Sequence, residues 1–208
     1  MPKINLSQDT NYVTMINYFS VAPKDQREFA EIEVKEINKY GDNMDGALAA
    51  SFHRSLEGSR VFNYAHWKSK EALEASQQTE EFKQHIQRMS YLDFTPDARV
   101  FAVISIDSLE TPEISQKDAY VPTLTMIYTD ENKQSEIIKK LQNQNILKQN
   151  EHIISSHILR SLDGDRVAVY VQNPNLSVAK SIEGSFEYLT ELADKIETLP
   201  YEILGSYN

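Results

Sequence analysis

The pattern of apolar and polar positions predicts two series of strands and helices in the same order, βαββαβ. The first series has a strand at 12–20, a helix at 23–40, a hairpin around 54–64, a helical stretch at 68–91 broken near 78–79, and a strand at 99–106. The second has a strand at 121–129, a helix at 130–145, a hairpin around 160–170, a helix at 182–198 and a strand at 201–206. The two series therefore predict two units of one fold.

The two hairpins carry an internal repeat. Residues 54–64 read RSLEGSRVFNY and residues 160–170 read RSLDGDRVAVY, with seven identities in eleven ungapped positions at a constant offset of 106. Gly58 and Gly164 fall in the predicted turns, where a positive φ favours glycine. The repeat indicates a tandem duplication.

Both faces of the first predicted strand are apolar. Val13, Met15 and Phe19 point to one side, and Ile16 and Tyr18 to the other. A sheet that is apolar on both faces needs cover on both, so helices on one side leave the other face for the second unit. We therefore expect two sheets facing each other to form a barrel, with a pocket between them.

Composition narrows the class of protein. The 208 residues include no cysteine, which excludes disulfides and thiolate metal sites and is typical of the cytoplasm. The net charge of −10 argues against nucleic acid as a partner. No apolar run approaches the roughly 20 residues of a membrane span, and the N-terminus has no secretory pattern. We expect no membrane partner.

Residues 63–72, NYAHWKSKEA, resemble the signature of the antibiotic-biosynthesis-monooxygenase family, in which a third strand ends in a W-x-S turn that opens a helix. Residues 53–58 and 81–85 are also similar to the family. The resemblance covers 12–106 well and 120–207 only through the repeat. It implies an α+β fold in which two ferredoxin-like βαββαβ units form a dimeric α+β barrel, here within one chain.

This fold divides the chain into a first domain at 1–107 that carries the site, a linker at 108–119 and a second, diverged domain at 120–208. Members of the family normally build the barrel from two chains. A tandem chain can complete it as a monomeric pseudo-dimer, and a further homodimer remains equally allowed.

The family includes cofactor-free monooxygenases that form quinones from aromatic polyketides, haem-degrading monooxygenases, and members without an assigned reaction. In the cofactor-free enzymes, the residues that match Asn63 and Trp67 face the substrate pocket. The resemblance thus implies a small aromatic substrate, dioxygen and no cofactor. Strand alternation also puts Asn63 and Trp67 on one face. Asn63 can donate a hydrogen bond to a phenolate or ketone oxygen, and Trp67 can orient the ring. Alternatively, Trp67 packs in the core and Asn63 completes a polar network.

Other family positions are matched less closely. Leu73 replaces the aromatic phenol of the quinone-forming enzymes. A later basic position maps approximately onto His85, a candidate general base or else a histidine at the core edge. Asn17, Tyr18 and Arg88 are candidate substrate-binding residues, and Tyr91 is a further pocket candidate.

The haem-degrading branch fits less well. Asn17 matches its first-strand asparagine, but Ser76 stands where that branch has a tryptophan. Its helical histidine would fall at Ile86, one residue from His85, and one residue turns a helix by about 100°. Haem degradation therefore ranks below the cofactor-free reaction.

Two histidines flank the first hairpin turn, His53 and His66, without a third ligand at a convincing spacing, so we expect no metal site. In the second copy, Val169 and Asn173 replace Asn63 and Trp67. The hypothesis is one potentially active half and one half that completes the barrel. A non-catalytic binder of an apolar metabolite is the alternative function.

Overall fold

The computed structural model describes residues 4–5, 12–40, 44–108, 113–114, 120–144, 150 and 152–207. The first unit contains β2 Val13–Val21, α1 Gln26–Tyr40, β3 Ala47–Ser55, β4 Arg60–Trp67, α2 Lys70–Gln77, α3 Glu80–Met89 and β5 Phe94–Ser108. The second contains β7 Thr123–Tyr128, α4 Glu131–Gln144, β8 Ser155–Ser161, β9 Arg166–Gln172, α6 Leu176–Ser181, the 3₁₀ helix η2 Glu183–Leu189 and β10 Lys195–Tyr207. A small separate sheet pairs β1 Ile4–Asn5 with β6 Glu113–Ile114.

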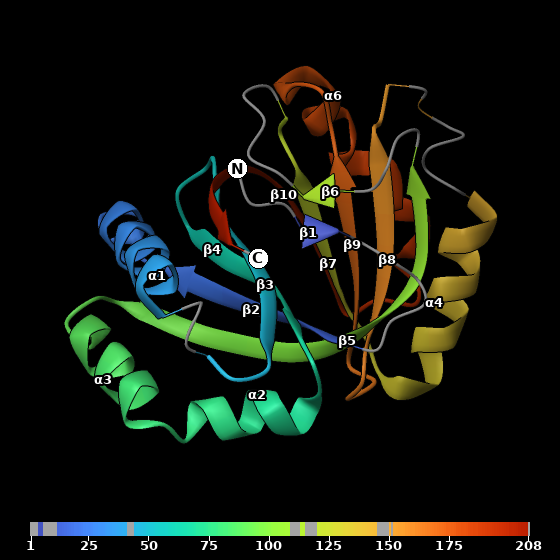
Figure 1. The fold of residues 1–208 in the computed structure, drawn as a ribbon. Helices are drawn as coiled ribbons and strands as arrows, with labels where there is room; N and C mark the ends of the chain where they lie inside the picture. Colours follow the sequence, from blue (N-terminus) through green and yellow to red (C-terminus); the bar gives the residue numbers. More distant parts are fainter. Residues whose placement is uncertain are drawn as a thin grey trace.

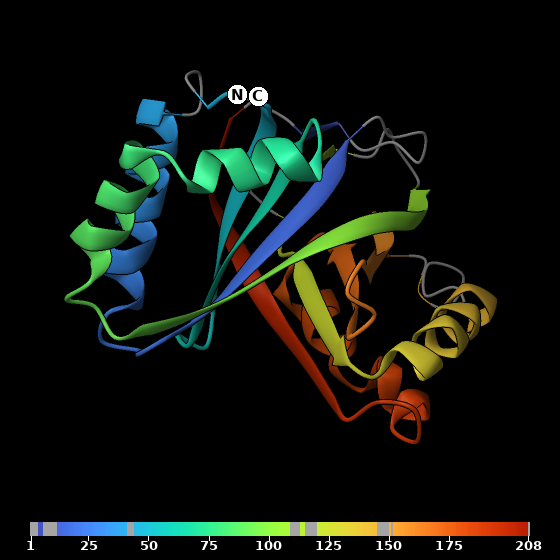
Figure 2. The same ribbon diagram turned by 90° about the horizontal axis from the view of Figure 1, so that it is seen from below.

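Eight strands form one closed barrel in the order β10-β3-β4-β2-β5-β8-β9-β7. The last strand of each unit joins the two halves. Strand β5 pairs with β2 of its own unit and β8 of the other, and β10 pairs with β7 and β3. The helices of the two units lie on opposite outer sides of the barrel (Figures 1 and 2). The predicted intramolecular dimeric α+β barrel is confirmed.

A buried glutamine holds the hairpin of each unit in the same way. Gln26 Nε2 donates to the carbonyl oxygens of Ser55, at 2.9 Å, and Arg60, at 3.0 Å. The second unit repeats this contact with Gln134, Ser161 and Arg166, at 3.0 Å and 2.8 Å. We call this contact the glutamine clamp. Gly58 and Gly164 have φ values of 99° and 80°, which confirms the predicted turn glycines.

Ion pairs link the units in a reciprocal way. Arg60 of the first unit lies 2.9 Å from Glu197 of the second, and Arg166 of the second lies 2.7 Å from Asp97 of the first. Each pair joins the start of a unit's third strand to the other unit's last strand. Such reciprocity is typical of a two-fold interface, here built within one chain.

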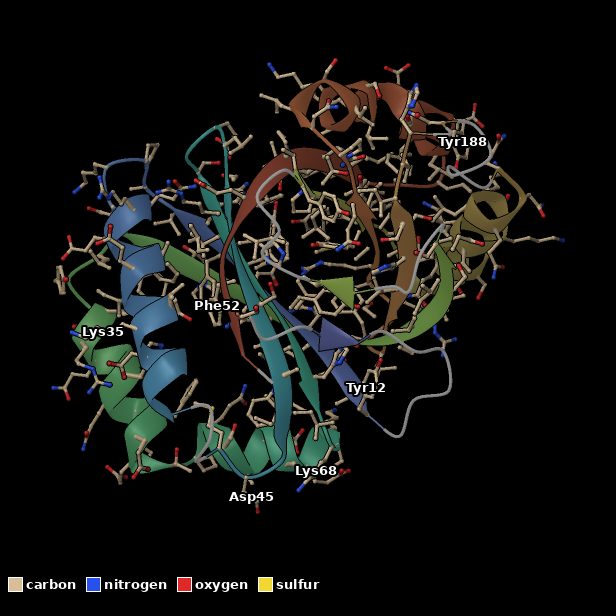
Figure 3. All side chains as sticks on the ribbon, turned by 45° about the horizontal axis from the view of Figure 1, so that its top comes forward. Tyr12, Lys35, Asp45, Phe52, Lys68 and Tyr188 are labelled. Atoms are coloured by element: carbon tan, nitrogen blue, oxygen red, sulfur yellow. The ribbon has the colours of Figure 1, made fainter. Side chains whose placement is uncertain are left out.

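Side chains fill the inside of the barrel (Figure 3). The largest of these buried side chains are Ile16, Phe62, Tyr64, Phe101, Tyr170 and Tyr201. Eight strands enclose just enough space for side chains to fill it. The predicted alternation of the first strand holds, because Ile16 and Tyr18 face inward while Met15 and Phe19 pack on the outside. The expectation of a pocket between the two sheets stays a prediction.

Three predicted elements differ from the structure. The predicted helix at 182–198 is wrong, because α6 ends at Ser181, η2 follows, and the chain joins the barrel as β10 from Lys195. The strands predicted at 99–106 and 201–206 extend to Phe94–Ser108 and Lys195–Tyr207. In each case, pairing with strands of both units overrides the local pattern.

The other helices follow the predicted pattern. The break near 78–79 is confirmed, since Thr79 caps α3. Helix α1 begins at Gln26, three residues after its predicted start. Of the predicted linker, the structure describes only 108 and 113–114, so the domain limits stay a prediction. No helix within the described residues is long and apolar enough to cross a membrane.

Candidate active site

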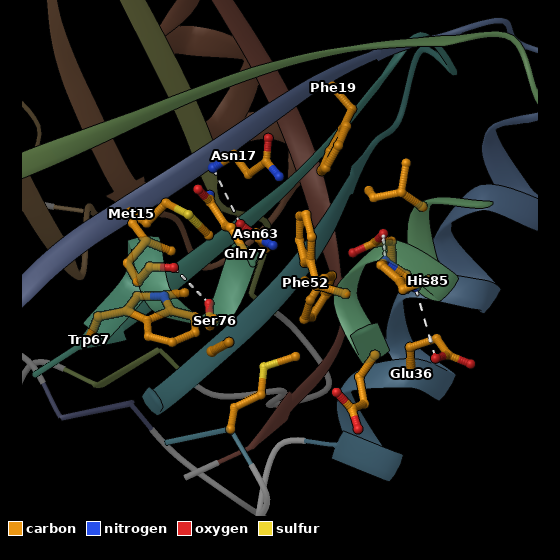
Figure 4. Close-up of a pocket in the computed structure, with 18 residues that line it drawn as sticks. Met15, Asn17, Phe19, Glu36, Phe52, Asn63, Trp67, Ser76, Gln77 and His85 are labelled. Atoms are coloured by element: carbon orange, nitrogen blue, oxygen red, sulfur yellow. Dashed lines mark hydrogen bonds and ion pairs between the residues drawn. The ribbon is translucent and has the colours of Figure 1, made fainter. Parts of the chain in front are cut away.

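The pocket lies in the first unit, between the outer face of its sheet and its helices (Figure 4). It contains about 100 Å³ of cavity, and the empty space, mouth included, is about 870 Å³. The apolar part of its wall includes Met15, Phe19, Phe52, Leu73, Phe82 and Ile86. The inner cavity therefore suits a small aromatic system, with the rest of a larger molecule in the mouth.

Strand β4 and the turn after it position the two residues that the sequence singled out. Asn63 and Trp67 alternate with the inward-facing Tyr64, so both point toward the helices. Ser69 then caps α2 by accepting a hydrogen bond from the backbone N–H of Ala72 at 3.2 Å. The helix thus starts directly after the strand and covers Trp67.

Several polar atoms of residues that line the pocket lack a hydrogen-bond partner among the described residues. Asn63 Oδ1 accepts a hydrogen bond from the backbone N–H of Asn17 at 3.3 Å, so its amide nitrogen remains to donate. Trp67 is 5% exposed, and its buried Nε1 has no acceptor among the described residues. The Oδ1 of Asn17 likewise has no donor there. Buried polar groups normally have partners, so these three atoms favour a ligand that both accepts and donates.

A buried carboxylate holds the pocket histidine. His85 Nε2 lies 2.9 Å from Glu33 Oε1, and Nδ1 lies 3.9 Å from Glu36 Oε2. The Glu33 side chain is only 7% exposed. Contact through Nε2 fixes the ring, and Nδ1 is buried without a hydrogen-bond partner among the described residues. Sequence reasoning missed Glu33, although its place on the buried face of α1, three residues after Ala30, was a detectable signal.

Three candidate residues lie outside the pocket, so these assignments need correction. Tyr18 faces the barrel interior, where its hydroxyl donates to Glu197 at 2.9 Å. Arg88 does not line the cavity but pairs with Glu36, which ties α3 to α1. Tyr91 is 65% exposed. The alternation of side chains along β2 explains why Tyr18 points inward, because its neighbour Asn17 points outward.

The positions that separate the family branches do border the pocket. Leu73 is 5% exposed and provides an apolar wall where the quinone-forming enzymes carry a phenol. The Ser76 hydroxyl donates to the Leu73 carbonyl oxygen at 2.8 Å, within α2. His85 and Ile86 both line the cavity, so the one-residue offset does not turn His85 away.

The two hairpin histidines lie inside the barrel. His53 Nε2 is 3.1 Å from the Tyr170 hydroxyl, and His66 stacks on Tyr12 with ring centroids 4.0 Å apart. Burial lowers the pKa of His53 to about 3 and that of His66 to about 4. Within the described ranges, no group of three or more histidine, cysteine or acidic side chains is arranged to hold a metal ion.

The matching face of the second unit is an apolar core. Val169, at the position of Asn63, is 1% exposed and packs there. The surrounding side chains include Ile127, Ile137, Ile158, Val167, Val171 and Phe186. Asn173, at the position of Trp67, donates from Nδ2 to the Val121 carbonyl oxygen at 2.9 Å and so holds the start of β7.

The fold and its pocket place the chain among the dimeric α+β barrel proteins. Residues 12–88, which lie in the first unit, match the family described as antibiotic biosynthesis monooxygenase. Over 64 residues the chain is 38% identical to tetracenomycin-F1 monooxygenase of Streptomyces glaucescens, a match that covers 31% of this chain and 57% of that enzyme.

Two solved structures share the whole tandem fold. An anthrone oxidase-like protein superposes with a TM-score of 0.84 at 16% identity, over 99% of this chain and 95% of its own. A candidate monooxygenase from Fusobacterium nucleatum gives a TM-score of 0.65 at 11% identity, over 95% and 94% of the two chains. At these identities the likeness establishes the fold alone.

Proposed function

We propose that the chain is a cofactor-independent monooxygenase that oxidises an aromatic or quinonoid small molecule with dioxygen. The observation that carries the proposal is the convergence of Asn63, Trp67 and His85 on one apolar cavity. The family match of residues 12–88 and the 38% identity to tetracenomycin-F1 monooxygenase support it. The acidic, cysteine-free composition favours the cytoplasm as the compartment.

In the proposed reaction, His85 Nδ1 takes the proton of a phenolic hydroxyl while Glu33 orients the ring. Asn63 and Trp67 donate hydrogen bonds to the phenolate oxygen, which stabilises the anion and directs it toward dioxygen. One oxygen atom enters the ring as a carbonyl, and the other leaves as water with the two hydrogens that the substrate loses. The substrate supplies all the electrons, so no reductant is needed.

The apolar wall at Leu73 favours a second candidate, a non-catalytic binder of an apolar metabolite. Oxygen consumption across a panel of phenols and hydroquinones separates the two. Uptake that needs both protein and substrate, and falls in Asn63→Ala, supports the monooxygenase. Saturable binding without uptake by any member of the panel supports the binder. Haem degradation is not proposed, because Ser76 replaces the tryptophan of that branch.

A further inference from the structure

Apart from His85, the ionisable side chains that line the pocket are all acidic. Glu33, Glu36 and Glu81 line the cavity, and no lysine or arginine does so among the described residues. Arg88 pairs with Glu36 without bordering the cavity. His85 is thus the one described lining residue that can carry a positive charge, and Glu33 already holds its Nε2. A ligand anion would find no cation free to pair with it.

Burying a charged group without a partner is costly, and carboxylates nearby add repulsion. A neutral phenol avoids both costs. Its oxygen can accept from Trp67 Nε1, which is buried and without an acceptor among the described residues, and its hydroxyl can donate to His85 Nδ1. Asn17 Oδ1 can accept from a second neutral donor of the ligand. The polar atoms therefore favour a neutral hydroxyl or carbonyl group, while the charges disfavour an acid.

We propose that this pocket selects neutral or cationic fused-ring phenols and rejects their carboxylated counterparts. The selection rests on the proposed function for the role of the site, but it concerns binding and needs no turnover. The negative charge of the ligand then appears only inside the pocket, when His85 removes the phenolic proton.

The test uses three ligands of nearly the same shape: 6-hydroxy-2-naphthamide, 6-hydroxy-2-naphthoate and 6-(aminomethyl)-2-naphthol. Quenching of the fluorescence of Trp67, the single tryptophan of the chain, reports binding at the pocket wall, and calorimetry gives an independent Kd. We expect the amide to bind at least tenfold more tightly than the carboxylate. The amine should bind at least as tightly as the amide.

A matched pair of variants separates the pocket wall from the overall negative charge. Glu81 lines the mouth, whereas its neighbour Glu80 does not, and both are exposed in the first turn of α3. Glu81→Lys should reduce the preference for the amide over the carboxylate at least threefold. Glu80→Lys makes the same change in net charge and should leave the preference within 1.5-fold.

Each result of these binding experiments either supports or overturns the charge selection. Equal binding of amide and carboxylate would overturn the charge selection, and so would equal effects of the two lysine variants. Selective binding without oxygen uptake would support the selection while contradicting the monooxygenase. Failure of all three ligands to bind would overturn the selection and remove the pocket from the proposed function.

Discussion

The two units of the chain share a scaffold but differ in what lies under their helices. Both keep the glutamine clamp, with Gln26 in the first unit and Gln134 in the second. Under the helices, the first unit has a pocket with Asn63 on its wall, and the second has an apolar core with Val169 in its place. The barrel needs both sheets to close, which accounts for the shared scaffold, whereas a single pocket is enough for a site.

The largest expected difference between the units is in activity. Asn63→Ala removes a donor to the developing phenolate and should lower oxygen uptake about 100-fold. Val169→Ala, the matched change in the second unit, should leave uptake within twofold of wild type. An oxygen electrode with the best phenol of the panel measures both. Comparable losses in the two variants would contradict the division between the units.

The barrel interior, which the units share, should make the protein sensitive to acid. Burial lowers the pKa of His53 and of His157 to about 3, against 6.5 without it, so both fold as neutral rings. Their stabilisation is present above the unfolded pKa and is lost as the pH falls toward the folded values. Between pH 7 and pH 5 each should cost about 2 kcal/mol of unfolding free energy.

Urea titrations at the two pH values measure this loss. Neither ring nitrogen of His157 has a partner among the described residues, so His157→Leu should reduce the pH dependence by about 2 kcal/mol. The exposed His152 provides the control, and His152→Gln should change nothing. The histidine account fails if His157→Leu retains the full acid sensitivity.

The two glutamine clamps should contribute equally to the free energy of unfolding. Gln26→Met and Gln134→Met keep the side-chain length but remove the side-chain donor to two carbonyl oxygens of a hairpin. Each change should lower the free energy of unfolding by about 1.5 kcal/mol. The midpoints of urea unfolding for the two variants test whether the two losses are equal. A loss confined to one unit would show that the scaffold is not shared energetically.

The smallest expected effect concerns Glu33, which positions His85. Glu33→Gln should lower kcat about tenfold and change KM less than twofold, because it alters the histidine and not the ligand contacts. Glu31→Gln, on the exposed side of the same helix, is the control. A rise in KM with unchanged kcat would indicate that Glu33 binds the ligand directly.

Local signals in the sequence predicted much of this structure. The repeat predicted the two units, and strand alternation put Asn63 and Trp67 on the face opposite Tyr64. The full length of β10 could not be predicted, because Lys195 joins the barrel only through pairing with Tyr128 of another strand. The pocket on the outer face of the sheet was not predicted, since alternation separates the two faces but does not say which one the helices cover.

The most direct measurement is a crystal structure of the protein with 6-hydroxy-2-naphthamide. The account predicts ligand density between β4 and α3 of the first unit, with the phenol oxygen within hydrogen-bond distance of Asn63 and Trp67. The matching space between β9 and α4 of the second unit should hold none. Ligand density inside the barrel, or against Val169 in the second unit, would contradict the assignment of the site to the first unit.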